Sequence, residues 1–270
     1  MEKYNKKIDA LIDGWRDEIY ETLKGWVAID SPSVESAGEG KPFGENVRKA
    51  LDQALSDAEK MGFAVRNFDG YAGDISMGEG AQTLGMLAHL DVVPAGDGWT
   101  HDPVACDKAD GRVYGRGVMD DKGPAIAALY AMRAVRDAGV RLKDGVRLIL
   151  GCDEEVAMRG LKYYASKVKM PDYGFSPDAE YPLINIEKGG VNILLSCACA
   201  GEDGASLPVY SIEAGERVNV VPGTARAVVG TKNVSVDELK ARLSGADYKF
   251  TVTDLGDNRA QIETIGVQAH

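Results

Sequence analysis

Acidic and histidine side chains follow several apolar runs of this sequence. His89 ends the apolar part of TLGMLAHLD, close to Asp91. Three further segments, GRGVMDDKG, RLILGCDEE and YGFSPDAE, supply the acids Asp120, Asp121, Asp153, Glu154, Glu155, Asp178 and Glu180. Any one of these acids could be a helix cap or a solvated loop residue, and for Asp120 alone capping is an equally good explanation. Their repetition at the ends of apolar runs instead indicates one shared site.

Imidazole and carboxylate groups together form a typical ligand set for Zn²⁺, and less specifically for Mn²⁺ or Co²⁺. The four cysteines include no CxxC pair, so the pattern is not that of a thiolate zinc finger. Carboxylates can also bridge two cations about 3.5–4 Å apart, which activates a water and polarises a carbonyl. The adjacent Glu154 and Glu155 suit two different tasks, one as a ligand and the other as a general base.

The elements around these acids alternate between strands and helices as far as about Lys188. Apolar residues at helical spacing predict helices over 4–29, 46–61, 124–138 and 156–168, while TLGMLAHL and GVRLILGCD read as buried strands. This alternation predicts an α/β fold with a mixed, mostly parallel sheet sandwiched by helices. Ligands bind beyond the carboxyl ends of such strands, so we expect the acidic segments to meet there.

The sequence changes character after Gly189 and Gly190. Short strands and one helix near 236–243 predict a smaller α+β unit. We therefore expect two domains, a metal-binding domain over residues 1–188 and a second domain over residues 189–270.

Charge and composition limit the partners. The formal net charge is −11, so nucleic acids and anionic membranes are not expected to bind. No apolar stretch reaches the roughly 20 residues that span a bilayer. The N-terminal segment has no apolar run like that of a signal peptide, and no cysteine pattern demands oxidation. We therefore expect a cytoplasmic protein.

Four motifs carry a resemblance to a known family. AHLDVVPAGDGW, GRGVMDDKG, CDEE and SPDAEYP occur in this order and resemble the zinc metallopeptidase family of carnosinases, aminoacylases and desuccinylases. The likeness is greatest to its bacterial Xaa-His dipeptidases. It implies a zinc-exopeptidase-like catalytic domain with a lid domain, two Zn²⁺ ions per active site, and hydrolysis of dipeptides of the Xaa-His or β-Ala type.

The resemblance also implies a role for each matching residue. His89, Asp120 and Asp178 match the ligands of one metal, with Asp120 bridging to the second metal. The remaining matches are Glu155 as a ligand of the second metal, Glu154 as the general base, and Asp91 as the residue that hydrogen-bonds His89 and fixes its tautomer. The peptide bond between Asp120 and Asp121 is expected to be cis.

The second domain resembles the family's lid. Asn219 corresponds to an asparagine near the substrate, although it could simply be a turn residue. His270 corresponds to the lid histidine that donates to the carbonyl oxygen. The family's histidine ligand for the second metal has no counterpart here. We therefore expect this chain to be an N-terminal fragment that binds its second metal weakly and whose own activity is doubtful.

Two other functions remain open. One is deacylation or desuccinylation of N-acyl amino acids by the same chemistry, although the aspartate at position 178 favours dipeptides. The other is a non-catalytic, metal-binding fragment. The small peptide substrate, the physiological metal and the oligomeric state are not specified further by the sequence.

Overall fold

A computed structural model describes residues 2–35, 38–186, 188–189, 191, 193–195, 207–215 and 221–266. The chain divides into two compact units. The first comprises Met1–Ala95 and Thr100–Asn185, and the second comprises Gly96–Trp99 and Ile186–His270. The sequence placed its boundary between residues 188 and 189. The two units are described separately below.

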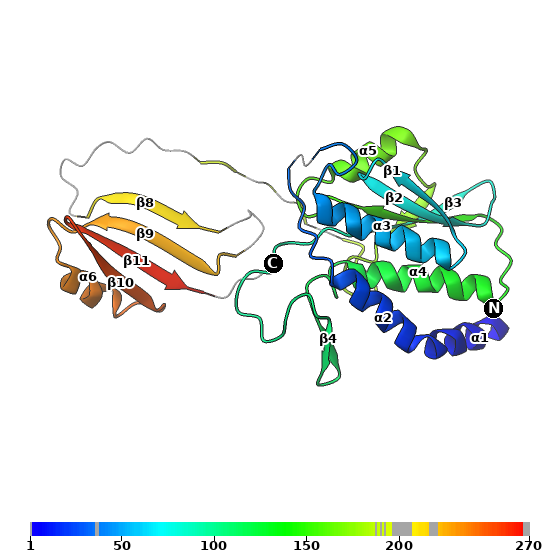
Figure 1. Ribbon diagram of the computed structural model, residues 1–270, viewed down its shortest axis with the longest axis horizontal. Coiled ribbons are helices and arrows are strands. Elements are labelled where there is room, and N and C mark those ends of the chain that lie inside the picture. The colour runs from blue at the N-terminus through cyan, green and yellow to red at the C-terminus, as the bar shows by residue number, and fades with distance from the viewer. Residues whose placement is uncertain are drawn as a thin grey trace. The chain divides into compact units, whose positions relative to one another are not determined.

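A five-stranded sheet forms the centre of the first unit (Figure 1). Its order is β1 (Ala64–Phe68), β2 (Ala72–Met77), β6 (Gly145–Gly151), β3 (Thr83–His89) and β7 (Tyr173–Phe175). β3 pairs in parallel with β6 and β7, whereas β2 is antiparallel to β1 and β6. β2 therefore runs opposite to the other four strands, which confirms the mixed, mostly parallel α/β fold.

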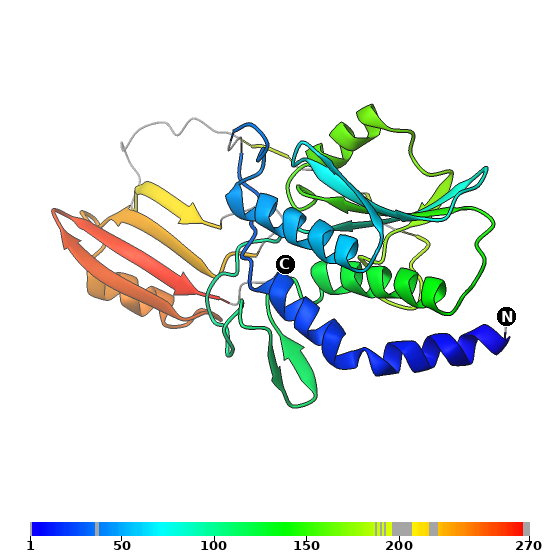
Figure 2. The ribbon, with the colours of Figure 1, turned by 45° about the vertical axis from the view of Figure 1, so that its right-hand side comes forward.

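Helices cover both faces of this sheet (Figure 2). Leu148 and Leu150 of β6 pack in one core with α3 (Glu45–Lys60) and α4 (Lys122–Asp137). Ile149 points to the opposite face and packs with α5 (Arg159–Lys167). This alternation follows from the two-residue period of a strand.

The N-terminal helical segment is two helices rather than the single helix that was predicted. α1 (Glu2–Gly14) and α2 (Arg16–Val27) meet at Trp15. Gly14 is a weak helix former, and the Trp15 ring packs near the Tyr130 ring and under the guanidinium of Arg133, both on α4. This packing on α4 accounts for the break, which the helical periodicity did not reveal.

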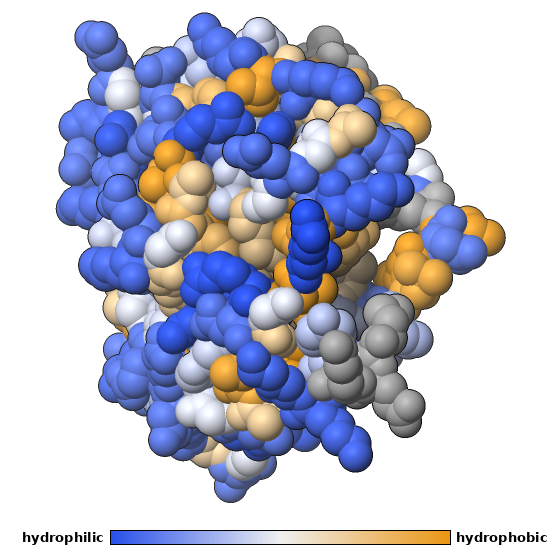
Figure 3. Space-filling view, turned by 90° about the vertical axis from the view of Figure 1, so that its right-hand side faces the viewer, coloured by the Kyte–Doolittle hydropathy of each residue, from blue (hydrophilic) through white to orange (hydrophobic). Residues whose placement is uncertain are grey.

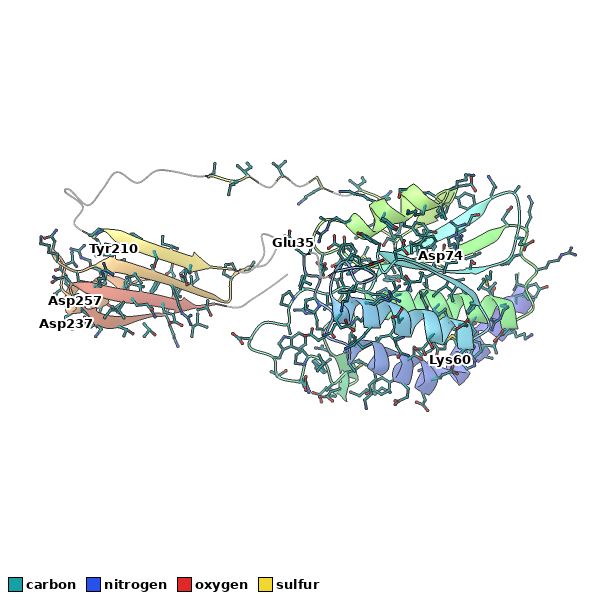
Figure 4. The ribbon with its side chains drawn as sticks, turned by 45° about the horizontal axis from the view of Figure 1, so that its top comes forward. Glu35, Lys60, Asp74, Tyr210, Asp237 and Asp257 are labelled. Atoms are coloured by element: carbon teal, nitrogen blue, oxygen red, sulfur yellow. The ribbon has the colours of Figure 1, made fainter. Side chains whose placement is uncertain are left out.

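A buried carboxylate joins α5 to the sheet. Asp74 of β2, labelled in Figure 4, is fully buried. It accepts hydrogen bonds from Arg66 of β1, at 2.9 Å from its Nε, and from the Tyr164 hydroxyl of α5 at 2.7 Å. These bonds satisfy a buried charge and hold α5 against the sheet close to the segment that carries Glu154.

The second unit contains a four-stranded antiparallel sheet. Its order is β10 (Phe250–Gly256), β11 (Arg259–Ile265), β9 (Thr224–Gly230) and β8 (Val209–Ala214). Leu239 of α6 (Val236–Leu243) packs on this sheet with Val229 and Ala260. The predicted helix near 236–243 is confirmed. The assignment of this unit as a lid stays a prediction.

Three further features complete the description of the fold. A small hairpin of β4 (Asp107–Ala109) and β5 (Arg112–Tyr114) belongs to the first unit. Hydrophilic residues cover most of the face shown in Figure 3, with apolar side chains visible between them. Within the described ranges, no helix combines the length and the apolar character needed to cross a bilayer.

Candidate metal centre

The predicted acids lie at one edge of the first unit's sheet. β3 ends at His89 and β6 ends at Gly151, and these two residues are paired in register. β7 lies beside β3 and ends at Phe175, shortly before Asp178. Because these three strands are parallel, their carboxyl ends lie together, where α/β folds bind ligands.

His89 lies among the carboxylates. Its Nε2 atom is 3.0 Å from Asp120 Oδ1, 3.3 Å from Asp178 Oδ2 and 3.8 Å from Glu154 Oε2. The His89 side chain is 2% exposed, whereas those of Asp120, Glu154 and Asp178 are 40%, 35% and 27% exposed. The imidazole is therefore fixed within the protein while the carboxylates remain open to a ligand.

Two candidate ligand groups share His89. One adds Glu154 and Asp178, the other adds Asp120 and Glu155, and the ligand atoms of each group lie within 4.8 Å of one another. An imidazole nitrogen and carboxylate oxygens at this spacing form a suitable ligand set for zinc. The structure thus brings together all four predicted ligands and the predicted base. Asp120 and Asp178, which the resemblance placed on one metal, lie 3.0 and 3.3 Å from His89 Nε2.

Asp91 contacts His89 through its backbone. The His89 Nδ1 atom is 2.8 Å from the Asp91 carbonyl oxygen and 3.5 Å from its carboxylate. A carbonyl oxygen only accepts hydrogen bonds, so Nδ1 donates to it, and Nε2 is the ring nitrogen that a metal could bind after its proton is displaced. The carboxylate of Asp91 instead accepts from the backbone N–H groups of Glu154, at 3.0 Å, and Glu155, at 3.1 Å.

The side chain of Asp153 also fixes the segment that carries Glu154 and Glu155. Its buried carboxylate accepts from the Ser33 hydroxyl at 2.6 Å and from Nε and Nη2 of Arg159 at 2.7 and 2.9 Å. These hydrogen bonds lower the pKa of Asp153 despite its burial, which acts in the opposite direction. The sequence analysis missed Ser33 and Arg159, because neither a serine nor an arginine belongs to a metal-ligand pattern.

The segment before α4 supplies Asp120. The Asp120–Asp121 peptide bond is cis, as predicted. Asp121 Oδ2 accepts from the backbone N–H of His89 at 2.9 Å, while Oδ1 has no hydrogen-bond partner among the described residues. The buried Lys122 donates to the carbonyl oxygens of Trp26 and Ile29 at 3.0 and 2.7 Å. Lys122 thereby joins the start of α4 to the end of α2.

The crowding of charges shifts several pKa values. Burial disfavours the charged form of His89, but hydrogen bonds to the carboxylates, Asp120 first, outweigh it and raise the pKa of His89. Burial, followed by the charge of Asp120, raises the pKa of Glu155 to about 7. Burial likewise raises the pKa of Glu154. A cation that binds these groups must displace their protons, so its binding is expected to depend on pH.

Similarity to known proteins supports this arrangement. A family model described as peptidase family M20/M25/M40 matches residues 85–258, the range that contains the site from His89 to Asp178. The chain belongs to this peptidase family. M20 peptidases are metal-dependent, in agreement with the two candidate ligand groups. The family resemblance found in the sequence is confirmed.

Several individual proteins are similar to this M20 chain in sequence or in structure. It is 41% identical over 238 residues to YtjP of Bacillus subtilis, covering 87% of this chain and 51% of YtjP. It is 37% identical over 263 residues to the Beta-Ala-Xaa dipeptidase of Lactobacillus delbrueckii subsp. lactis, covering 96% and 56% of the two chains. The crystal structure of human carnosine dipeptidase 1 matches with a TM-score of 0.57 and 28% identity, over 65% of this chain and 41% of that one. The M20 chain spans about half the length of the curated relatives it matches.

Two predicted site residues lie outside the described residues. Asn219 and His270 fall in the ranges 216–220 and 267–270, which the structure does not describe. Their roles near the substrate stay predictions.

Proposed function

We propose that the protein is a metal-dependent dipeptidase that hydrolyses dipeptides of the Xaa-His or β-Ala type. The observation that carries this proposal is the meeting of His89 with carboxylates from three other segments at one edge of the sheet. Relatives named as a Beta-Ala-Xaa dipeptidase and a carnosine dipeptidase support the substrate class.

The proposed metal ligands are those that the resemblance implied. His89, Asp120 and Asp178 would hold one Zn²⁺, and Glu155 together with Asp120 would hold the second. Bound zinc supplies Lewis acidity toward a water and the scissile carbonyl. Mn²⁺ or Co²⁺ would suit the same oxygen and nitrogen ligands.

Glu154 is the proposed general base. Its side chain is 35% exposed, so a water and a peptide can reach it. Burial raises its pKa toward neutrality, where a carboxylate accepts a proton more readily. Glu154 would take a proton from the attacking water and deliver it to the leaving amine nitrogen.

The second unit is proposed to act as the lid. In this proposal Asn219 lies near the substrate and His270 donates to the oxygen of the scissile carbonyl, which stabilises developing negative charge. Both roles rest on the family resemblance.

Two neighbouring substitutions test the mechanism in the zinc-loaded protein. Glu154→Gln is expected to lower kcat for β-Ala-His by about 10²–10⁴-fold and to leave the zinc content unchanged. Glu155→Gln is expected to lower the zinc content itself. An unchanged kcat in Glu154→Gln would refute the assignment of the base. Faster cleavage of N-acyl amino acids than of any dipeptide would favour the deacylase alternative.

A further inference from the structure

We infer that the segment 29–33 positions three parts of the candidate metal centre. Within this segment, Ser33 is a positioning residue for the proposed base Glu154 and acts through Asp153. The inference rests on the proposed function, because that function assigns proton transfer to Glu154. Ser31 and Ser33 lie outside both candidate ligand groups, so their part is to hold the backbone in place and not to bind metal.

The first contact of the segment 29–33 is with the start of α4. The buried side chain of Lys122 donates from Nζ to the carbonyl oxygen of Ile29 at 2.7 Å. Lys122 comes two residues after Asp120, which belongs to one candidate ligand group. A buried ammonium group is costly unless it is hydrogen-bonded, so this contact ties the beginning of the segment to the backbone that carries Asp120.

The middle of the segment is bonded to the backbone that follows β3. The fully buried Ser31 hydroxyl donates to the Leu90 carbonyl oxygen at 2.7 Å, and the Ser31 carbonyl oxygen accepts from the Val92 N–H at 3.1 Å. Pro32 forms a parallel bridge with Val92. Leu90 directly follows His89. These contacts restrain the backbone after His89, because they hold it at two positions.

The end of the segment reaches the turn after β6. The Ser33 hydroxyl donates to Asp153 Oδ1 at 2.6 Å, a length typical of a hydroxyl that donates to an ionised carboxylate, and both residues are 1% exposed. The Asp153 carbonyl oxygen accepts from the Met158 N–H at 2.7 Å, and its carboxylate accepts from the Arg159 N–H at 3.2 Å. Ser33 therefore holds the residue on which the turn that contains Glu154 closes.

One short segment thus bonds beside His89, Asp120 and Glu154, which lie far apart in the sequence. Their relative position matters, because a displacement of about 1 Å in an active site can lower the rate about 100-fold. The two serines act on different parts of the centre. Ser31 restrains the end of β3, and Ser33 restrains the turn after β6.

Ser33→Ala and Ser31→Ala form a matched pair for the test. Each removes one hydroxyl from a residue that is at most 1% exposed. Amide hydrogen exchange of the metal-free protein, measured by NMR, reports the turn after β6 at Met158 and Arg159, and the end of β3 at Val92. Ser33→Ala should accelerate exchange at Met158 and Arg159 about tenfold relative to the centre of β6, and at Val92 by less than about twofold. Ser31→Ala should show the reverse pattern.

The zinc-loaded protein gives a second readout. Ser33→Ala should lower kcat for β-Ala-His at least about tenfold and leave KM within about twofold, because the proposed base Glu154 is displaced while the rest of the site still binds the peptide. A purely structural role of Ser33 would instead accelerate exchange in the centre of β6 as much as in the turn. That result would overturn the inference.

Two other results would also overturn it. One is unchanged exchange at Met158 and Arg159 in Ser33→Ala, which would show that the hydroxyl does not hold the turn. The other comes from wild type and decides the matter even if Ser33→Ala does not fold. Exchange at these two amides as fast as in exposed loops would show that Asp153 does not close the turn, whereas slow exchange would support the inference. A wild-type protein that hydrolyses no dipeptide would refute the proposed function alone, because the exchange measurement needs neither metal nor substrate.

Discussion

The carboxyl group of Asp121 should make the stability of the metal-free protein depend on pH. Asp121 is fully buried, and its Oδ1 atom has no hydrogen-bond partner among the described residues. Burial, partly offset by the charge of His89, raises the pKa of Asp121 from 3.8 to about 8. The folded protein therefore holds a proton on Asp121 at neutral pH, which the unfolded chain releases.

The sign and size of the effect follow from this difference. The folded state binds the proton more tightly than the unfolded state, so the contribution of Asp121 is fully present below the unfolded pKa. It is lost progressively as the pH rises toward the folded pKa of about 8. Each pH unit within this window changes the free energy of unfolding by about 1.4 kcal/mol. Raising the pH from about 5 to about 7 should therefore lower the free energy of unfolding by about 3 kcal/mol through Asp121 alone.

Asp121→Asn tests this reasoning. The amide oxygen can still accept from the backbone N–H of His89, a bond that is 2.9 Å long in the structure, but the side chain no longer titrates. Urea denaturation with a chelator at both pH values gives the free energy of unfolding. Glu155, whose pKa is also raised, contributes to both proteins, so the difference between them isolates Asp121. Equal losses of stability in wild type and Asp121→Asn would refute the argument.

Three further substitutions should change the stability of the protein, measured by the urea midpoint. Gly123→Ala should destabilise the protein by about 3 kcal/mol, because a Cβ at this position would lie 1.9 Å from the Val118 carbonyl oxygen. Gly25→Ala should instead stabilise α2 by about 0.5–1 kcal/mol, because a Cβ there would have nothing within 4 Å. A destabilised Gly25→Ala or a neutral Gly123→Ala would contradict this packing. Tyr164→Phe should cost about 2 kcal/mol by removing the 2.7 Å hydrogen bond to buried Asp74, and no change in the midpoint would show that this bond contributes nothing.

The elements of the first unit were largely predictable because apolar periodicity reports burial directly. The helices predicted over 46–61 and 124–138 are observed at Glu45–Lys60 and Lys122–Asp137. The helix predicted over 156–168 begins later, at Arg159. Asp153 explains the delay, since its backbone carbonyl accepts from the N–H of Met158 and its carboxylate from that of Arg159. These bonds keep the intervening residues in a turn.

The segment PLINIEKGG contains alternating apolar and other residues, as a short strand does, yet no strand is observed among its described residues 182–186, 188 and 189. A strand needs a neighbouring strand to pair with. The residue pattern of a segment specifies which side chains prefer burial, but it does not specify whether a partner edge is within reach.

By itself, the sequence determined the chemical groups of the site and the family, because residue types in ordered motifs define which ligands are present. It named His89 and the four carboxylates that the structure gathers around it. Only the tertiary structure decided which atoms meet. The carbonyl oxygen of Asp91 lies 2.8 Å from His89 Nδ1, its carboxylate lies 3.5 Å from the same atom, and this carboxylate also accepts from the backbone N–H groups of Glu154 and Glu155. The physical reason is that such contacts join the ends of β3 and β6, so they depend on strand register and on the direction of each N–H and C=O group, which local residue types do not encode.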